Sequence, residues 1–162
     1  MERDTSQGAA LLRGRSLTVL TLLALLVALG ATAPSAHASA PTRYMVKRIN
    51  AVRAMVGLPR LHMRRDLRRS ARRYAARLMR TGYFGHASRI QASRRYRFKG
   101  EILERHGGLR ARVPLALQAW LRSPTHRAVM LNPAFRYIGA GKVTGRWRGH
   151  REVIWVVHFG RR

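Results

Sequence analysis

Apolar residues recur at helical spacing near the start of the region that follows residue 39. The repeat consists of Met45, Ile49, Val52 and Val56. Spacings of three and four residues place these side chains on one face of a helix. Gly57-Leu58-Pro59 follows and is typical of a helix end. The pattern therefore predicts a first amphipathic helix that ends at Gly57.

A second helix is expected to begin at Asp66, which suits an N-cap, and to end at Thr81-Gly82. Its apolar stripe is formed by Leu67, Ala71, Tyr74 and Leu78. Arginines cover much of the remaining surface: Arg68, Arg69, Arg72, Arg73, Arg77 and Arg80. This helix is predicted to bury one narrow face and to expose a strongly basic one.

Two more helices are predicted further along the chain. The third has Pro114 in its first turn and an apolar side made of Val113, Leu117, Trp120 and Leu121. The fourth is short and runs from Pro124 to Leu131, with Ser123 as its expected cap. The intervening residues 83–112 are predicted to form loops with short helical pieces.

Strands are expected only near the end of the chain. The pattern predicts one strand from Tyr137 to Val143, a turn from Thr144 to Gly149, and a second strand from Arg151 to Phe159 that is apolar on both faces. A strand of that kind usually lies in the middle of a sheet covered on both sides. Helices first and strands last predict an α+β fold, with helices on either side of a small sheet.

The first 38 residues have the composition of a secretory signal peptide. Arg13 and Arg15 precede an apolar run over residues 17–29, and Ala36-His37-Ala38 offers a cleavage site. The alternative is an uncleaved N-terminal anchor. Because no second long apolar stretch follows, we expect residues 39–162 to form one domain without a transmembrane span, secreted or located at the cell envelope. The chain has no cysteine, so this domain must be stabilised by packing alone.

Basic residues greatly outnumber acidic ones. The chain has 33 Lys+Arg against 6 Asp+Glu, a net charge of +27. Removing Arg3, Arg13, Arg15, Glu2 and Asp4 with the signal peptide leaves 30 against 4, a charge of about +26. Such a field attracts phosphates, anionic glycans and anionic lipids in a salt-dependent manner. GC-rich coding is an alternative source of part of the arginine excess, although it does not account for the scarcity of acids.

Five short motifs occur in a fixed order: Phe84-Gly85-His86, Gly100-Glu101, Ser123-Pro124-Thr125-His126-Arg127, Leu131-Asn132-Pro133 and Ile138-Gly139-Ala140-Gly141. In this order they resemble the CAP superfamily, the SCP-like extracellular domain, in its bacterial secreted form. The resemblance covers nearly all of residues 43–160. It implies an α-β-α sandwich with a small, mainly antiparallel sheet between helices.

The resemblance also implies a cleft shared by His86, Glu101 and His126. The two histidines are then candidate ligands for a divalent metal such as zinc, which imidazole nitrogens bind well. If the protein is an enzyme, Glu101 is the candidate catalytic residue, as a general base. A purely structural role for Glu101, tying loops together, is the alternative. Ile102 and Thr125 replace the asparagine and glycine typical of the family motifs.

The remaining histidines are weaker candidates. His62 and His106 are expected in solvent-facing loops, and His150 beside a turn. His158 lies at the end of the last strand, either near the cleft or, as the preferred interpretation, packed in the core. Glu104 is considered as a substitute acid one helical turn beyond Glu101. Motifs of zinc proteases, serine hydrolases and phosphate-binding loops are absent from the sequence.

Two functions follow as hypotheses. The first is a non-enzymatic binding module at the cell envelope, with anionic envelope polymers or lipids as partners and a small ligand or ion in the cleft. The second is a metal-dependent hydrolase that uses the His/Glu cleft. Tyr96 and Phe98 alternate with basic residues and could stack on sugars or bases. Nucleic acid is a less favoured partner, and lipid or sterol carriage, found in some CAP relatives, stays open.

Overall fold

A computed structural model describes residues 40–162. The predicted signal peptide, residues 1–38, lies outside the described residues. The elements, in chain order, are α2 (Ala40–Met55), β1 (His62–Met63), α3 (Arg65–Thr81), β2 (Phe98–Gly107), α4 (Val113–Arg122), α5 (Pro124–Met130), β3 (Tyr137–Trp147) and β4 (His150–Arg161). No helix among them is long and apolar enough to cross a membrane.

The four strands form one mixed sheet in the order β1-β3-β4-β2. Strand β4 pairs antiparallel with β3 and with β2, whereas the two-residue β1 pairs parallel with β3. Residues Val153–Val157 and Phe159 of β4 are fully buried, and they alternate between the two sides of the sheet. This confirms the prediction of a central strand covered on both faces.

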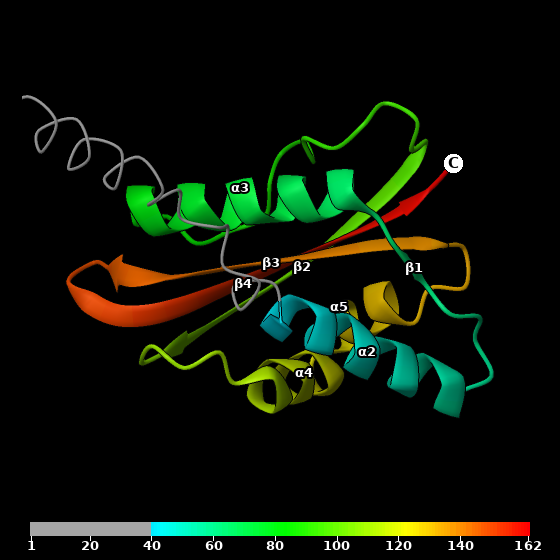
Figure 1. The fold of residues 1–162 in the computed structure, drawn as a ribbon, viewed down its shortest axis with the longest axis horizontal. Coiled ribbons are helices and arrows are strands. Elements are labelled where there is room, and N and C mark those ends of the chain that lie inside the picture. Colours follow the sequence, from blue (N-terminus) through cyan, green and yellow to red (C-terminus); the bar gives the residue numbers. More distant parts are fainter. Residues whose placement is uncertain (1–39) are drawn as a thin grey trace, which may run out of the picture. The chain divides into compact units, whose positions relative to one another are not determined.

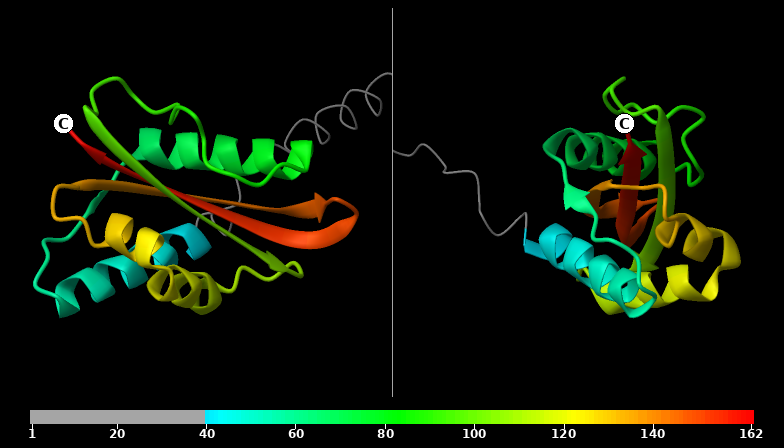
Figure 2. Two further views of the ribbon diagram at one scale, coloured as in Figure 1. Left: turned by 180° about the vertical axis from the view of Figure 1, so that it is seen from behind. Right: turned by 90° about the vertical axis from the view of Figure 1, so that its right-hand side faces the viewer.

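Helices cover both faces of the sheet, and each face has its own core. Helix α3 lies along one face, while α2, α4 and α5 lie on the other (Figures 1 and 2). The larger core packs Met45, Trp120 and Phe135 against Trp155 and Phe159. The smaller one packs Ala71, Ala75 and Leu78 of α3 against Ile154 and Val156. The predicted α+β fold, an α-β-α sandwich, is thereby confirmed.

Two glycines bring α3 unusually close to the sheet. A side chain at Gly139 would overlap the backbone nitrogen of Arg68, and one at Gly141 would overlap that of Arg72. Only glycine allows a helix to lie directly on a strand in this way. The Ile138-Gly139-Ala140-Gly141 motif therefore fixes the position of α3, which carries several of the residues facing the cavity described below.

The main error of the sequence prediction concerns residues 98–107. They form a ten-residue strand, β2, and not a loop with helical pieces. Because β2 buries Glu101 and Glu104 on opposite faces, its sequence lacks the alternation of apolar and polar residues that marks a strand. Glu104 therefore does not lie one helical turn beyond Glu101, and it cannot substitute for it.

Smaller differences lie at element ends. Helix α3 has Arg64, not Asp66, at its N-cap position. Ser123 does occupy the N-cap of α5, but its hydroxyl contacts Thr125 Oγ1 at 3.2 Å instead of the helix backbone. The turn before β4 is shorter than predicted, because only Arg148 and Gly149 separate the strands, with φ of 47° and 85°. Positive φ at both positions is typical of a tight two-residue hairpin.

Candidate functional site

Glu101 is the centre of a polar cluster on the face of the sheet that α3 covers. It lies on β2 directly opposite His158 on β4. His158 Nε2 donates to Glu101 Oε2 at 2.8 Å, and His86 Nδ1 donates to Oε1 at 3.0 Å. The backbone N–H of Ala87 also donates to Oε1, at 2.9 Å. The carboxylate thus joins the central strand to the loop that carries His86.

Three donors favour the ionised form of this carboxyl group. Burial by itself raises the pKa of Glu101, since only 4% of its side chain is exposed. The hydrogen bonds from His158, Ala87 and His86 outweigh that effect and hold the pKa of Glu101 below its usual range. Both carboxylate oxygens are also engaged. Glu101 is therefore placed to orient imidazoles, and it is a poor general base.

His126 approaches the cluster from α5, across the edge strand β2. Its ring centroid lies 6.1 Å from that of His86, and the two rings are tilted by 42°. His86 is exposed over 58% of its side chain, whereas His126 is half-buried. Burial, and then the nearby His86, lower the pKa of His126. The structure therefore brings His86, Glu101 and His126 together, and it favours a neutral His126.

The two imidazoles are the residues here that could hold a metal. His86 Nδ1 is taken by Glu101, which leaves His86 Nε2 and the His126 ring as possible ligands. Within residues 40–162, no group of three His, Cys, Asp or Glu side chains converges on one point. The donor set thus fits an open two-histidine site, with Glu101 orienting one ligand from behind.

A cavity of about 330 Å³ lies beside the cluster, between α3 and the following loop. His86 and His158 both line it, but His126 does not. Other lining residues are Ser70, Arg73, Tyr74 and Arg77 of α3 and Tyr83, Ala87, Ser88, Arg89 and Gln91 of the loop. Tyr74 ties the two walls together, because its hydroxyl donates to the carbonyl oxygen of Gly85 at 2.8 Å.

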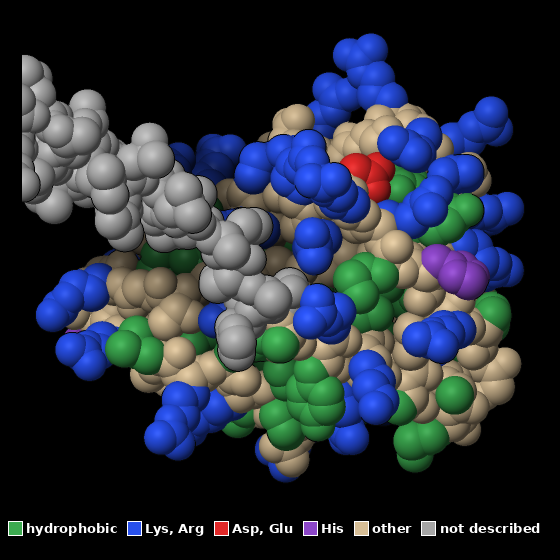
Figure 3. All heavy atoms as spheres, viewed as in Figure 1, with side chains coloured by type: hydrophobic (Ala, Val, Ile, Leu, Met, Phe, Trp, Pro, Cys, Tyr) green, Lys and Arg blue, Asp and Glu red, His purple; other side chains and the backbone are tan. Residues whose placement is uncertain are grey.

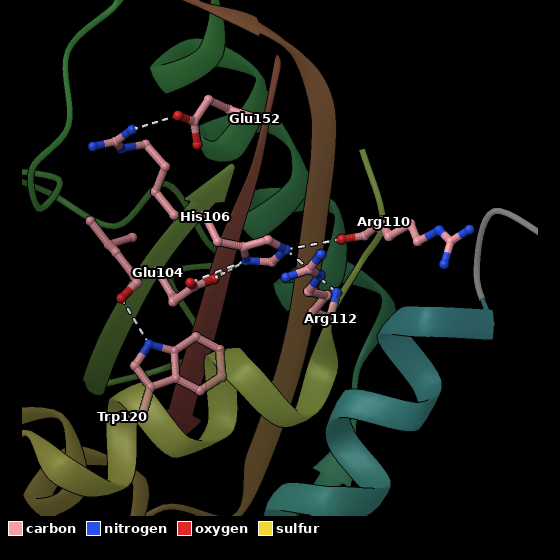
Figure 4. A network of polar contacts seen from close by, with 8 residues as sticks. Glu104, His106, Arg110, Arg112, Trp120 and Glu152 are labelled. Atoms are coloured by element: carbon pink, nitrogen blue, oxygen red, sulfur yellow. Dashed lines mark hydrogen bonds and ion pairs between the residues drawn. The ribbon is translucent and has the colours of Figure 1, made fainter. Parts of the chain in front are cut away.

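A second histidine–glutamate pair occupies the opposite face of β2 (Figure 4). His106 Nδ1 lies 2.9 Å from Glu104 Oε2, and His106 Nε2 lies 3.0 Å from the carbonyl oxygen of Arg110. Burial raises the pKa of Glu104, and the hydrogen bond from His106 only partly offsets this. The prediction that His106 faces solvent was wrong, because only 8% of the residue is exposed.

The four acidic residues of the described chain all have partners. Arg105 Nη1 contacts Glu152 Oε1 at 2.9 Å, and Asp66 accepts from the Tyr96 hydroxyl at 3.0 Å. Side-chain exposure is 4% for Glu101, 8% for Glu104 and 10% for Glu152, and only Asp66 reaches 29%. The surface view accordingly shows many basic side chains and very little red (Figure 3).

The sequence placed His158 either near the cleft or, as the preferred interpretation, in the core, and it did not predict Ser70 as a lining residue. His158 is fully buried, as the preferred interpretation expected, and its Nε2 also donates a hydrogen bond to Glu101 in the cluster. The pairing of β2 with β4 brings His158 and Glu101 together, and the sequence did not predict β2 as a strand.

Two aromatic residues that were expected to be available for stacking differ in exposure. Tyr96 is 2% exposed, whereas Phe98 is 46% exposed. His62 is exposed as expected, but within β1.

Comparison with known proteins identifies similar chains. Residues 46–159 match the family model CAP, the cysteine-rich secretory protein family. An outer surface protein from Borrelia burgdorferi is 22% identical, with a TM-score of 0.63 over 74% of this chain and 91% of that one. Schistosoma mansoni venom allergen-like protein 4 is 14% identical, with a TM-score of 0.62 over 76% and 89%. At these identities the likeness shows the fold alone.

An extracellular protein containing an SCP domain from Bacillus anthracis is also similar, at 22% identity and a TM-score of 0.62. The match covers 75% of this chain but only 40% of the Bacillus protein, which is therefore much longer than the shared domain. No curated protein matches the sequence.

Proposed function

Because this chain belongs to the CAP family, the cysteine-rich secretory proteins, we propose that it is a secreted binding module of the bacterial cell envelope. Its partner is an anionic envelope polymer, held by the arginines of its surface, and it catalyses no reaction on that polymer. The two bacterial proteins described above support the location, since one is described as an outer surface protein and the other as extracellular.

The distribution of the acidic residues carries this proposal. Three of the four acids in residues 40–162 are nearly buried and are paired with histidine or arginine, so they neutralise little of the surface charge. Because the glutamates lie inside the domain, few acidic groups compete with an external anion for the surface arginines. A surface of one sign raises the local concentration of oppositely charged polymers and accelerates their binding.

Helix α3 is the densest part of this surface. Its side facing away from the sheet exposes Arg65, Arg69, Arg72, Arg73, Arg77 and Arg80. Guanidinium groups bind phosphate and carboxylate through paired hydrogen bonds, and they remain charged at any relevant pH. We assign the docking surface for the polymer to this helix, hereafter the α3 arginine surface.

The test measures the affinity of residues 39–162 for a poly(glycerol phosphate) wall polymer over a range of salt concentrations. Each phosphate neutralised contributes to a linear fall of log K with log salt. We expect a steep fall and a large loss of affinity in Arg69→Gln/Arg72→Gln/Arg80→Gln. The matched control is Arg110→Gln/Arg122→Gln/Arg127→Gln, which removes the same charge from exposed positions away from α3.

An equal loss in the two triple variants would contradict the assignment to α3. Binding that does not respond to salt would contradict the electrostatic proposal as a whole. Vesicles containing anionic lipid provide a parallel arm, and tighter binding to vesicles than to polymer at equal phosphate concentration would move the proposal from polymers to lipids.

The approach of His86 and His126 supports a second proposal, binding of a divalent metal such as zinc in the cleft. A neutral His126 and a His86 oriented by Glu101 are both competent ligands. Hydrolysis with Glu101 as general base is the less supported alternative, because both of its oxygens already accept hydrogen bonds. Calorimetric titration of the metal-stripped protein with zinc, beside His86→Ala/His126→Ala, tests the site. Binding unchanged in that variant would refute it.

A further inference from the structure

Two polar atoms in the described part of the chain are buried without a hydrogen-bond partner and belong to residues that line the same cavity. They are Ser70 Oγ on α3 and His158 Nδ1 on β4. Ser70 is 2% exposed and His158 is fully buried. Buried polar groups are almost always satisfied, so an unsatisfied pair at one cavity needs a specific explanation. A polar ligand that reaches these two atoms from the cavity would satisfy both.

The chemistry of His158 restricts the kind of ligand. Its Nε2 faces the Glu101 carboxylate at 2.8 Å, and a carboxylate only accepts, so the hydrogen of the neutral ring sits on Nε2. Nδ1 is then an acceptor and calls for a hydroxyl or N–H donor. Ser70 Oγ can donate or accept and suits a second hydroxyl group.

Three arginines line the same cavity: Arg73 and Arg77 from α3 and Arg89 from the facing loop. Of these, Arg73 contacts the carbonyl oxygen of Gln91 at 3.3 Å, which uses one of its several donors. Arginine donors favour a carboxylate or phosphate group. With a volume of about 330 Å³, the cavity lies near the small end of the range typical of ligand pockets, about 300–1,000 Å³.

We infer that this cavity binds a small hydroxylated organic acid, of the size and kind of a sugar acid. Its hydroxyl groups would contact Ser70 Oγ and His158 Nδ1, and its acid group would face the arginines. The inference deepens the proposed binding function, on which it rests, by giving it a second site, a cavity that is open to solvent on one side. The cavity shares Arg73 and Arg77 with the α3 arginine surface, whereas the other four arginines of that surface and His126 do not line it.

The test is calorimetric titration of residues 39–162 with glucuronate, beside glucose and acetate. Glucose has the hydroxyl groups without the acid, and acetate has the acid without the hydroxyl groups. We expect each of them to bind at least about tenfold more weakly than glucuronate, since each loses one of the two sets of contacts. Glucuronate should also shift the ¹⁵N resonance of His158 Nδ1.

Ser70→Ala should weaken glucuronate binding about three- to tenfold, while the melting temperature stays equal or rises, because an unpartnered buried hydroxyl is removed. Arg77→Ala should weaken it about tenfold. The matched control is Arg80→Ala, because Arg80 lies on the same helix but does not line the cavity. This variant should bind glucuronate within about twofold of the wild-type affinity.

Absence of glucuronate binding, equal binding of acetate, or equal losses in Arg77→Ala and Arg80→Ala would each overturn the inference. These outcomes can be told apart from failure of the proposed function. If polymer binding persists with its salt dependence while glucuronate does not bind, only the cavity assignment fails. If glucuronate binds and the polymer does not, only the α3 arginine surface fails.

Discussion

Strand β2 carries two histidine–glutamate pairs, one on each face of the sheet, and their electrostatics are opposite. On the α3 face, Glu101 accepts from three donors and its pKa is lowered. On the α4 face, Glu104 accepts only from His106 among the described residues, and its pKa is raised (Figure 4). Burial is similar, with side-chain exposures of 4% and 8%.

The comparison shows that the hydrogen-bond donors around a buried carboxyl group, and not its depth of burial alone, decide the direction in which its pKa shifts in this fold. Desolvation favours the neutral form of both residues. Three hydrogen bonds reverse the effect of desolvation on the pKa of Glu101. At Glu104, the hydrogen bonds from His106 do not reverse it. Glu101 can therefore act as a fixed anion that orients His86 and His158, whereas the Glu104 pair joins β2 to the segment that leads into α4.

The largest effect should come from Glu101→Gln. An amide in place of the carboxylate presents one NH₂ group to donors that need an acceptor, and we expect a loss of about 2–3 kcal/mol in the free energy of unfolding at neutral pH. The folded-state pKa of Glu101 is lowered, so its stabilisation is present above the usual glutamate pKa and is lost as pH falls through the folded-state value. Urea unfolding at several pH values measures this.

A difference between wild type and Glu101→Gln that stays constant down to acid pH would refute the role of the charge. It would leave the shape of the side chain as the cause.

A smaller effect is expected for Glu104→Gln. At neutral pH its free energy of unfolding should equal that of wild type or exceed it by less than about 1 kcal/mol. Because the folded-state pKa of Glu104 is raised, its contribution to stability is full below the usual glutamate pKa and is lost as pH rises through the folded-state value. Relative to wild type, the free energy of unfolding of Glu104→Gln should therefore be higher at neutral pH than at acid pH. The opposite trend in urea unfolding would contradict the comparison.

The smallest effect should come from His126→Ala. The structure gives His126 a ring contact with His86 but no side-chain hydrogen bond within residues 40–162, so the free energy of unfolding should change by at most about 0.5 kcal/mol. His86→Ala removes a donor to Glu101 and should cost more, about 1 kcal/mol. Thermal unfolding of the two variants provides the measurement. Equal losses would mean that His86 does not support the Glu101 charge.

The sequence was sufficient for most of the fold because most elements bury apolar residues in a regular pattern. Helices α2, α3 and α4 and strand β4 were predicted in this way. Strand β2 was not, since it hides charged residues in pairs: Glu101 with His158, and Glu104 with His106. A buried ion pair resembles a polar, exposed segment in the sequence, and the partner that explains it can be 57 residues away.

The candidate site was predicted only in part, for the same reason. The family motifs identified His86, Glu101 and His126, which the structure brings together. They did not identify His158 or Ser70, because these residues join the site through strand pairing and the packing of α3. Neither relationship has a signature in the local sequence.

The most direct test of this account is a carbon-13 NMR titration of the side-chain carboxyl groups of Glu101 and Glu104 in residues 39–162. The account requires Glu101 to be an ionised, orienting group, so its pKa should lie below the usual glutamate range while that of Glu104 lies above it. A raised pKa at Glu101, or equal values at the two residues, would contradict the account. Glu101 would then have to be considered as a proton donor in the cleft.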